Sequence, residues 1–119
     1  MTDAPAIDPS ALDTLSETTG GDSAFLAELI DVFLADTVDL LAAIDAASVA
    51  GDAPELRRAA HSLKSNAATF GATALTTVAR QLEELGKAAD LDAVGALLAE
   101  ARREFARVER SLSATRAAL

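Results

Sequence analysis

The chain has 119 residues with a formal net charge of −9; half are apolar, 3% are aromatic and none is cysteine. This length suits one domain around a single core, and the lack of cysteine excludes disulfides and thiolate metal sites. The acidic balance argues against nucleic acid as a partner. The sequence shows neither a signal peptide nor an apolar run of the ~20 residues that a membrane span needs, so we expect no membrane association and a cytoplasmic location.

The apolar residues are mostly Ala and Leu, which favour helices, so the composition predicts an all-α fold. Residues 1–7 are expected to form a loose tail. Asp8 followed by Pro9 is typical of a helix start and predicts a short helix over 9–18. Asp22 or Ser23 can cap the next helix, which we expect to reach about Ala50, where Gly51 suits a left-handed end.

Three further helices are predicted in the second half of the chain. Asp52 is expected to cap a helix that ends near Phe70, because Gly71 suits the residue just past a helix end. The next helix is expected over about 72–85, closed by Gly86. Asp90 is expected to cap the last helix, which runs to about 115.

Each long predicted helix carries an apolar stripe at helical spacing. Short connections favour antiparallel neighbours, so we expect an up-down-up-down four-helix bundle over about 22–116. The short extra N-terminal helix would cap one end of this bundle. Residues 1–119 then form a single domain, which we expect to be monomeric.

His61, the single histidine of the chain, lies on a helix with two distinct faces. The apolar stripe of this helix is formed by Leu56, Ala60, Leu63, Ala67 and Phe70. At 100° per residue, His61 points roughly 140° away from the middle of that stripe, so its imidazole faces solvent. Residues 56–82 include four Lys or Arg and no Asp or Glu. A cationic zone around an exposed imidazole indicates a site for an anion.

Other kinds of site fit this pattern poorly. A metal site in a helical bundle needs inward Glu residues and Glu-x-x-His motifs, but the residue three positions before His61 is Arg58. No arrangement of Ser, His and Asp suggests a hydrolase, since Ser62 points elsewhere on the helix than His61. There is no glycine-rich phosphate loop, so we expect no nucleotide site.

The run from His61 to Gly71 resembles the signature of histidine-containing phosphotransfer (HPt) domains. That signature has an apolar residue two positions after the histidine, Lys three after, a small residue four after and Gly ten after. Here these positions hold Leu63, Lys64, Ser65 and Gly71. The family has Gly more often than Ser at the fourth position. The order and spacing of the helices extend the resemblance from about residue 25 to 112.

The resemblance implies a phosphoryl carrier of a two-component phosphorelay, without turnover of its own. His61 would accept a phosphoryl group on Nε2 from an aspartyl-phosphate of a response-regulator receiver domain, or from the receiver of a hybrid histidine kinase. It would then pass the group to another receiver. The receiver would bring Mg²⁺ and an acidic pocket, and this chain would bind no cofactor.

The roles of the neighbours follow from the same resemblance. Lys64 could reach the phosphoryl oxygens, with Arg57 as a second candidate. Small Ser65 and Ala68 would let a receiver approach, and Gly71 would end the helix beside this binding surface. The family commonly places a Gln or Glu 22 residues after the histidine to hold the Nδ1 proton, which here is Glu83.

Several alternatives stay open at this point. Gln81 replaces Glu83 as the residue that orients the ring if the helix register shifts, and Glu83 could instead pair with Lys87 one turn later. The chain could also be the phosphoacceptor domain of a larger chemotaxis-type histidine kinase. A third possibility is a helical scaffold that binds a partner and never carries phosphate.

Overall fold

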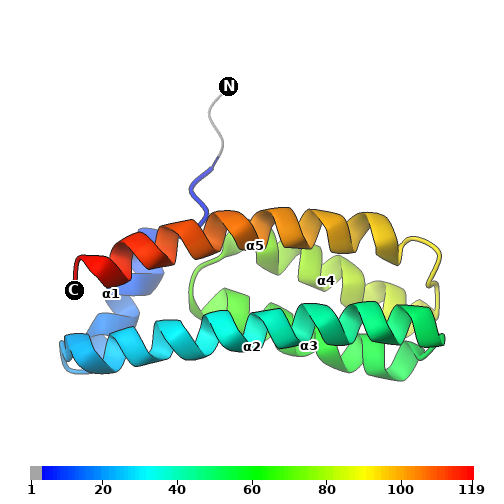
Figure 1. The fold of residues 1–119 in the computed structure, drawn as a ribbon, viewed down its shortest axis with the longest axis horizontal. Helices are drawn as coiled ribbons and strands as arrows, with labels where there is room; N and C mark the ends of the chain where they lie inside the picture. Colours follow the sequence, from blue (N-terminus) through cyan, green and yellow to red (C-terminus); the bar gives the residue numbers. More distant parts are fainter. Residues whose placement is uncertain (1–3) are drawn as a thin grey trace.

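The computed structural model describes residues 4–119. It contains five helices, which are α1 (Pro9–Thr18), α2 (Ser23–Ala50), α3 (Ala53–Thr69), α4 (Thr73–Ala88) and α5 (Val94–Ala117). The four long helices run antiparallel to their neighbours, and α1 lies near the end where α2 begins and α5 finishes (Figure 1). The predicted all-α, up-down-up-down bundle with a short first helix is confirmed. Among residues 4–119, no helix combines the length and apolarity needed to cross a membrane.

Acidic caps begin three of the helices at the predicted positions. The side chains of Asp8, Asp22 and Asp52 accept hydrogen bonds from the first-turn amides of α1, α2 and α3. These bonds satisfy amides that have no partner inside the helix. Gly51 and Gly71 follow α2 and α3 with φ of 71° and 69°, a backbone conformation that glycine adopts without steric cost. Caps and glycines together set the bounds of α3.

The apolar stripe of α3 is buried as predicted, and this burial fixes which face of the helix meets solvent. Leu56, Leu63 and Ala67 are each 0% exposed. Phe70, just after α3, stacks on Phe33 of α2 with ring centroids 4.4 Å apart. Rotating α3 would expose this stripe, so packing holds His61 on the outside of the bundle.

The prediction that Gly86 closes α4 is wrong. The helix continues to Ala88, and Ala89 adopts the left-handed conformation with φ of 54°. Gly86 lies inside the helix, where a Cβ atom would come within 2.8 Å of the Arg57 Cα. This glycine is therefore needed for the close approach of α3 and α4, a tertiary contact that the local pattern does not reveal.

Asp90 was also wrongly predicted as the cap of α5. The amide of Asp90 donates instead to the carbonyl of Leu85 (3.0 Å), and the amide of Ala89 donates to the carbonyl of Gly86. These two bonds form a Schellman motif at the end of α4. Helix α5 starts only at Val94, and no side chain caps it. Asp90 thus takes part, through its backbone amide, in the end of α4 and not in the start of α5.

The loose tail predicted for residues 1–7 is wrong at Ile7, which is only 4% exposed and belongs to the core. The next residue, Asp8, donates its amide to the carbonyl of Gly71 (2.8 Å). A Cβ atom on Gly71 would lie 2.6 Å from the Cβ of Ala11. Asp8 and Ala11 therefore pack on the α3–α4 turn. Residues 1–3 of the predicted tail lie outside the described part.

Candidate functional site

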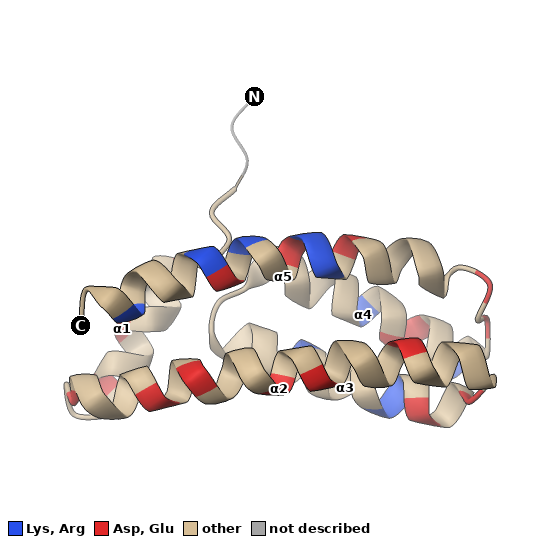
Figure 2. Ribbon diagram, viewed as in Figure 1, with Lys and Arg blue, Asp and Glu red and all other residues tan. Residues whose placement is uncertain are grey.

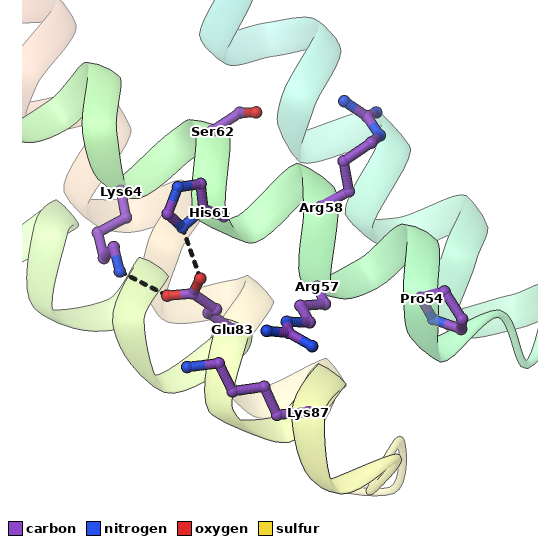
Figure 3. Close-up of a pocket in the computed structure, with 8 residues that line it drawn as sticks. All are labelled: Pro54, Arg57, Arg58, His61, Ser62, Lys64, Glu83 and Lys87. Atoms are coloured by element: carbon purple, nitrogen blue, oxygen red, sulfur yellow. Dashed lines mark hydrogen bonds and ion pairs between the residues drawn. The ribbon is translucent and has the colours of Figure 1, made fainter.

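His61 stands on the outer surface of α3, with its side chain 60% exposed. Its Nδ1 atom lies 2.6 Å from Oε2 of Glu83, which α4 presents from the neighbouring side (Figure 3). Within residues 4–119, no hydrogen bond engages the other ring nitrogen, Nε2. One nitrogen of the ring is thus held by the bundle, and the other is available to an incoming reactant.

Glu83 is a buried carboxylate, with its side chain 5% exposed, and both of its oxygens are engaged. Oε2 contacts His61, and Oε1 accepts a 2.6 Å bond from Nζ of Lys64. The hydrogen bond from Lys64 is the main cause that lowers the pKa of Glu83 to about 2; burial opposes this, and the His61 bond adds to it. Glu83 is therefore ionised near neutral pH, so the proton in the His61 contact belongs to Nδ1. In the neutral form of the ring, this tautomer leaves the lone pair on Nε2.

The antiparallel packing of α3 and α4 explains how residues 22 positions apart come into contact. Arg57 lies one turn before His61 on α3, and Gly86 lies nearly one turn after Glu83 on α4. The backbone contact between Arg57 and Gly86 sets the distance between the two helices at this level. One turn further along, the Glu83 side chain then spans the gap to the ring.

A hollow beside His61 gathers most of the nearby positive charge. Its lining consists of Pro54, Arg57, Arg58, His61, Ser62, Lys64, Glu83 and Lys87 (Figure 3). Arg58 is paired with Glu55 (2.6 Å), and Lys87 is paired with Glu84 (3.2 Å). Arg57 forms no ion pair within residues 4–119. The hollow therefore holds one cation whose charge is free to meet an anion.

The structure brings together four of the residues singled out from the sequence: Arg57, His61, Lys64 and Glu83. Lys64 differs from expectation, because its ammonium is bound to Glu83 rather than standing free. The alternative pairing of Glu83 with Lys87 is wrong, since Lys87 bonds Glu84.

The other predicted residues lie further along the same helices. Ser65 and Ala68 are exposed on α3. Ala68 and Gly71 line a second hollow that also includes Arg80, and the φ and close packing of Gly71 give it a structural reason to be glycine. Gln81 is exposed and makes no side-chain hydrogen bond in the described chain, so the ring contact falls to Glu83.

Sequence reasoning did not place Pro54, Arg58, Ser62 or Lys87 in the site. The helical spacing could have placed Lys87 in the site, because Lys87 follows Glu83 by one helical turn and so shares its face. Within residues 4–119, no group of three or more His, Cys, Asp or Glu side chains is arranged to hold a metal ion.

Comparison with known families matches residues 28–118 to the Hpt domain. The chain belongs to the histidine-containing phosphotransfer family. Its fold is also that of the HPt protein HptB from Pseudomonas aeruginosa PAO1, whose crystal structure superposes with a TM-score of 0.90. The two sequences are 32% identical, and the alignment covers 98% of this chain and 99% of HptB. Comparison with curated proteins gives no match. The family resemblance drawn from the His61 motif is thus confirmed.

Proposed function

We propose that this HPt protein carries phosphoryl groups between receiver domains, with His61 as the phosphorylated residue. The donor is an aspartyl-phosphate on a response-regulator receiver or on the receiver of a hybrid histidine kinase. The acceptor is the aspartate of another receiver. One observation carries the proposal: the exposed ring of His61 is fixed through Nδ1 by a buried, ionised Glu83, which leaves Nε2 facing solvent.

In the proposed step, the lone pair of His61 Nε2 attacks the phosphorus of the aspartyl-phosphate. An N–P bond forms, the acyl O–P bond breaks, and the receiver's aspartate leaves as a carboxylate. The Nδ1 proton stays on the ring, so the phosphorylated imidazole carries positive charge next to the carboxylate of Glu83, 2.6 Å from Nδ1. Because this charge pair strengthens as the bond forms, Glu83 favours the transition state as well as the correct tautomer.

The surrounding residues supply positioning and charge, which are the main needs of phosphoryl transfer. Lys64 anchors Glu83 and keeps two further N–H donors that can face the phosphoryl oxygens. Arg57 offers a guanidinium without a carboxylate partner among residues 4–119. Mg²⁺ is expected on the receiver, and the low profile of Ser65 and Ala68 leaves space for the receiver to dock.

The proposal is tested by mixing the purified chain with receivers of its source organism that carry labelled aspartyl-phosphate. Wild type should become labelled at His61 and return the label to a second receiver. His61→Gln should accept none, while a cooperative unfolding transition shows that the variant is still folded despite the lost bond to Glu83. Label on the His61→Gln variant would contradict the assignment of His61. A wild-type chain inert toward every phosphorylated receiver would favour the scaffold instead.

A further inference from the structure

Charge is unevenly divided along this chain. Residues 1–56 hold 12 of the 19 Asp and Glu residues and none of the ten Lys and Arg residues. Helix α2 consequently carries only acidic charge, as Figure 2 shows, and α3 and α4 carry the cations around His61. Because α3 packs against α2 on one side and α4 on the other, His61 stands between edges of opposite sign.

On the α2 edge, the negative charge comes from Asp36 and Asp39. Asp36 lines a hollow between α2 and α3 together with Asn66 and Thr69, and Asp39 follows three residues later on the same exposed surface. Neither forms an ion pair within residues 4–119, whereas Asp31 and Asp45 are bound by α5 arginines on the opposite edge of α2. Glu28 of α2 also forms no ion pair among the described residues, but Asp36 is the carboxylate of α2 that lines the hollow against α3, and Asp39 lies about one turn away from it.

On the α4 edge, the positive charge comes from Arg57 and Arg80. Arg57 lines the hollow that contains His61, and Arg80 lines the second hollow beside Ala68. Neither arginine forms an ion pair among the described residues, while Lys64 and Lys87 are neutralised by Glu83 and Glu84. Asp8 also lines the Arg80 hollow, where its carboxylate accepts hydrogen bonds from Ser10 at the start of α1. The face therefore has Asp36 and Asp39 toward α2 and Arg57 and Arg80 toward α4, with His61 between them.

We propose that this division of charge selects the rotational orientation of the docked receiver, an inference that rests on the proposed function. The reacting aspartate must lie over His61, but that requirement alone leaves the receiver free to rotate about the line through the two reacting atoms. A receiver with basic side chains over the α2 edge and carboxylates over the α4 edge is attracted in one orientation and repelled when turned by half a circle. Such complementarity acts on the encounter rate and on partner choice.

The experiment compares two double variants with equal change in net charge. Asp36→Lys with Asp39→Lys reverses the α2 edge, and Glu100→Lys with Glu109→Lys places the same charges on exposed positions of α5. The probe is the receiver that exchanges phosphoryl groups fastest with the wild-type chain. The transfer rate is measured at low and at saturating receiver concentration, in about 20 mM and in about 500 mM salt. At the higher salt concentration, exposed charges are screened within a few ångströms.

We expect the α2-edge variant to lower the rate at low receiver by about tenfold in low salt, with the loss shrinking to less than twofold in high salt. Its rate at saturating receiver should match wild type, since the His61 chemistry is untouched, and the α5 variant should transfer normally. An unchanged rate for the α2-edge variant, or an equal loss in the α5 variant, overturns the inference while the proposed function stands. If wild type exchanges with no receiver, the proposed function itself fails.

Discussion

Glu83 of α4 holds the ring of His61 on the neighbouring helix α3: Oε2 of the carboxylate lies 2.6 Å from Nδ1, although the residues are 22 positions apart in the sequence. The same carboxylate binds Lys64 through its other oxygen, so one buried anion links the two residues that the HPt signature places on α3. The His61 face is therefore built by two helices, with α4 supplying the group that fixes the ring.

Replacing Glu83 should slow phosphoryl transfer without weakening receiver docking. Glu83→Ala removes the acceptor of the Nδ1 proton and frees the ring to rotate, so we expect the transfer rate at saturating receiver to fall about 10²-fold. Glu83→Gln keeps a carbonyl acceptor and should recover part of this loss. Rapid-quench measurements with a phosphorylated receiver give both the saturating rate and the half-saturating concentration.

Glu84→Ala is the matched control, because Glu84 is an exposed neighbour that bonds Lys87 rather than the ring. It should transfer at the wild-type rate. A Glu83→Ala variant as fast as this control would mean that the contact with His61 has no role in positioning the ring.

The lowered pKa of Glu83 predicts how stability depends on pH. A carboxyl whose pKa falls from 4.5 to about 2 on folding contributes stability above pH 4.5, roughly 3 kcal/mol, and this contribution is lost as the pH drops toward 2. We therefore expect the difference in unfolding free energy between wild type and Glu83→Gln to shrink between pH 5 and pH 2. Urea unfolding at several pH values measures it; a difference that stays constant over this range would contradict the ionised, bonded carboxylate.

Two glycines inside helices should respond oppositely to alanine. At Gly86 the new methyl group would lie 2.8 Å from the Arg57 backbone, so Gly86→Ala should force α3 and α4 apart and cost about 1–3 kcal/mol. At Gly95 nothing lies within 4 Å, and Gly95→Ala should stabilise α5 by up to about 1 kcal/mol. Denaturant unfolding of both variants makes the comparison.

Because Glu83 lies one turn from Gly86, Gly86→Ala should also slow phosphoryl transfer, and Gly95→Ala should not. Equal stabilities for the two variants would show that the α3–α4 contact tolerates a side chain.

A large side chain at Ser65 should block the receiver. Ser65 is exposed one turn after His61, so Ser65→Trp adds bulk beside the reactive ring without entering the core. We expect labelled phosphoryl transfer to fall at least about tenfold while the thermal midpoint changes little. Arg103→Trp, at an exposed position of α5, should leave transfer intact. Normal transfer by Ser65→Trp would place the docking surface elsewhere.

The sequence alone determined the helices, their order and the outward direction of His61. These features depend on interactions within one helix: apolar residues repeat every three or four positions, and acidic caps and glycines mark most of the ends. The spacing of His61, Leu63, Lys64, Ser65 and Gly71 also identified the family, because all five lie on one continuous segment.

Only the tertiary structure decided what holds the ring. From the sequence, Glu83 could contact His61 or pair with Lys87, and Gln81 was an alternative. The choice depends on how α3 and α4 are aligned, and the contact of Gly86 with the Arg57 backbone sets that alignment. The sequence predicts a helix end at this same glycine, because the local signal of glycine is the same whether it ends a helix or lets a neighbouring helix approach. Contacts between distant segments, including the burial of Ile7, leave no periodic mark in the sequence and are settled only when the helices pack.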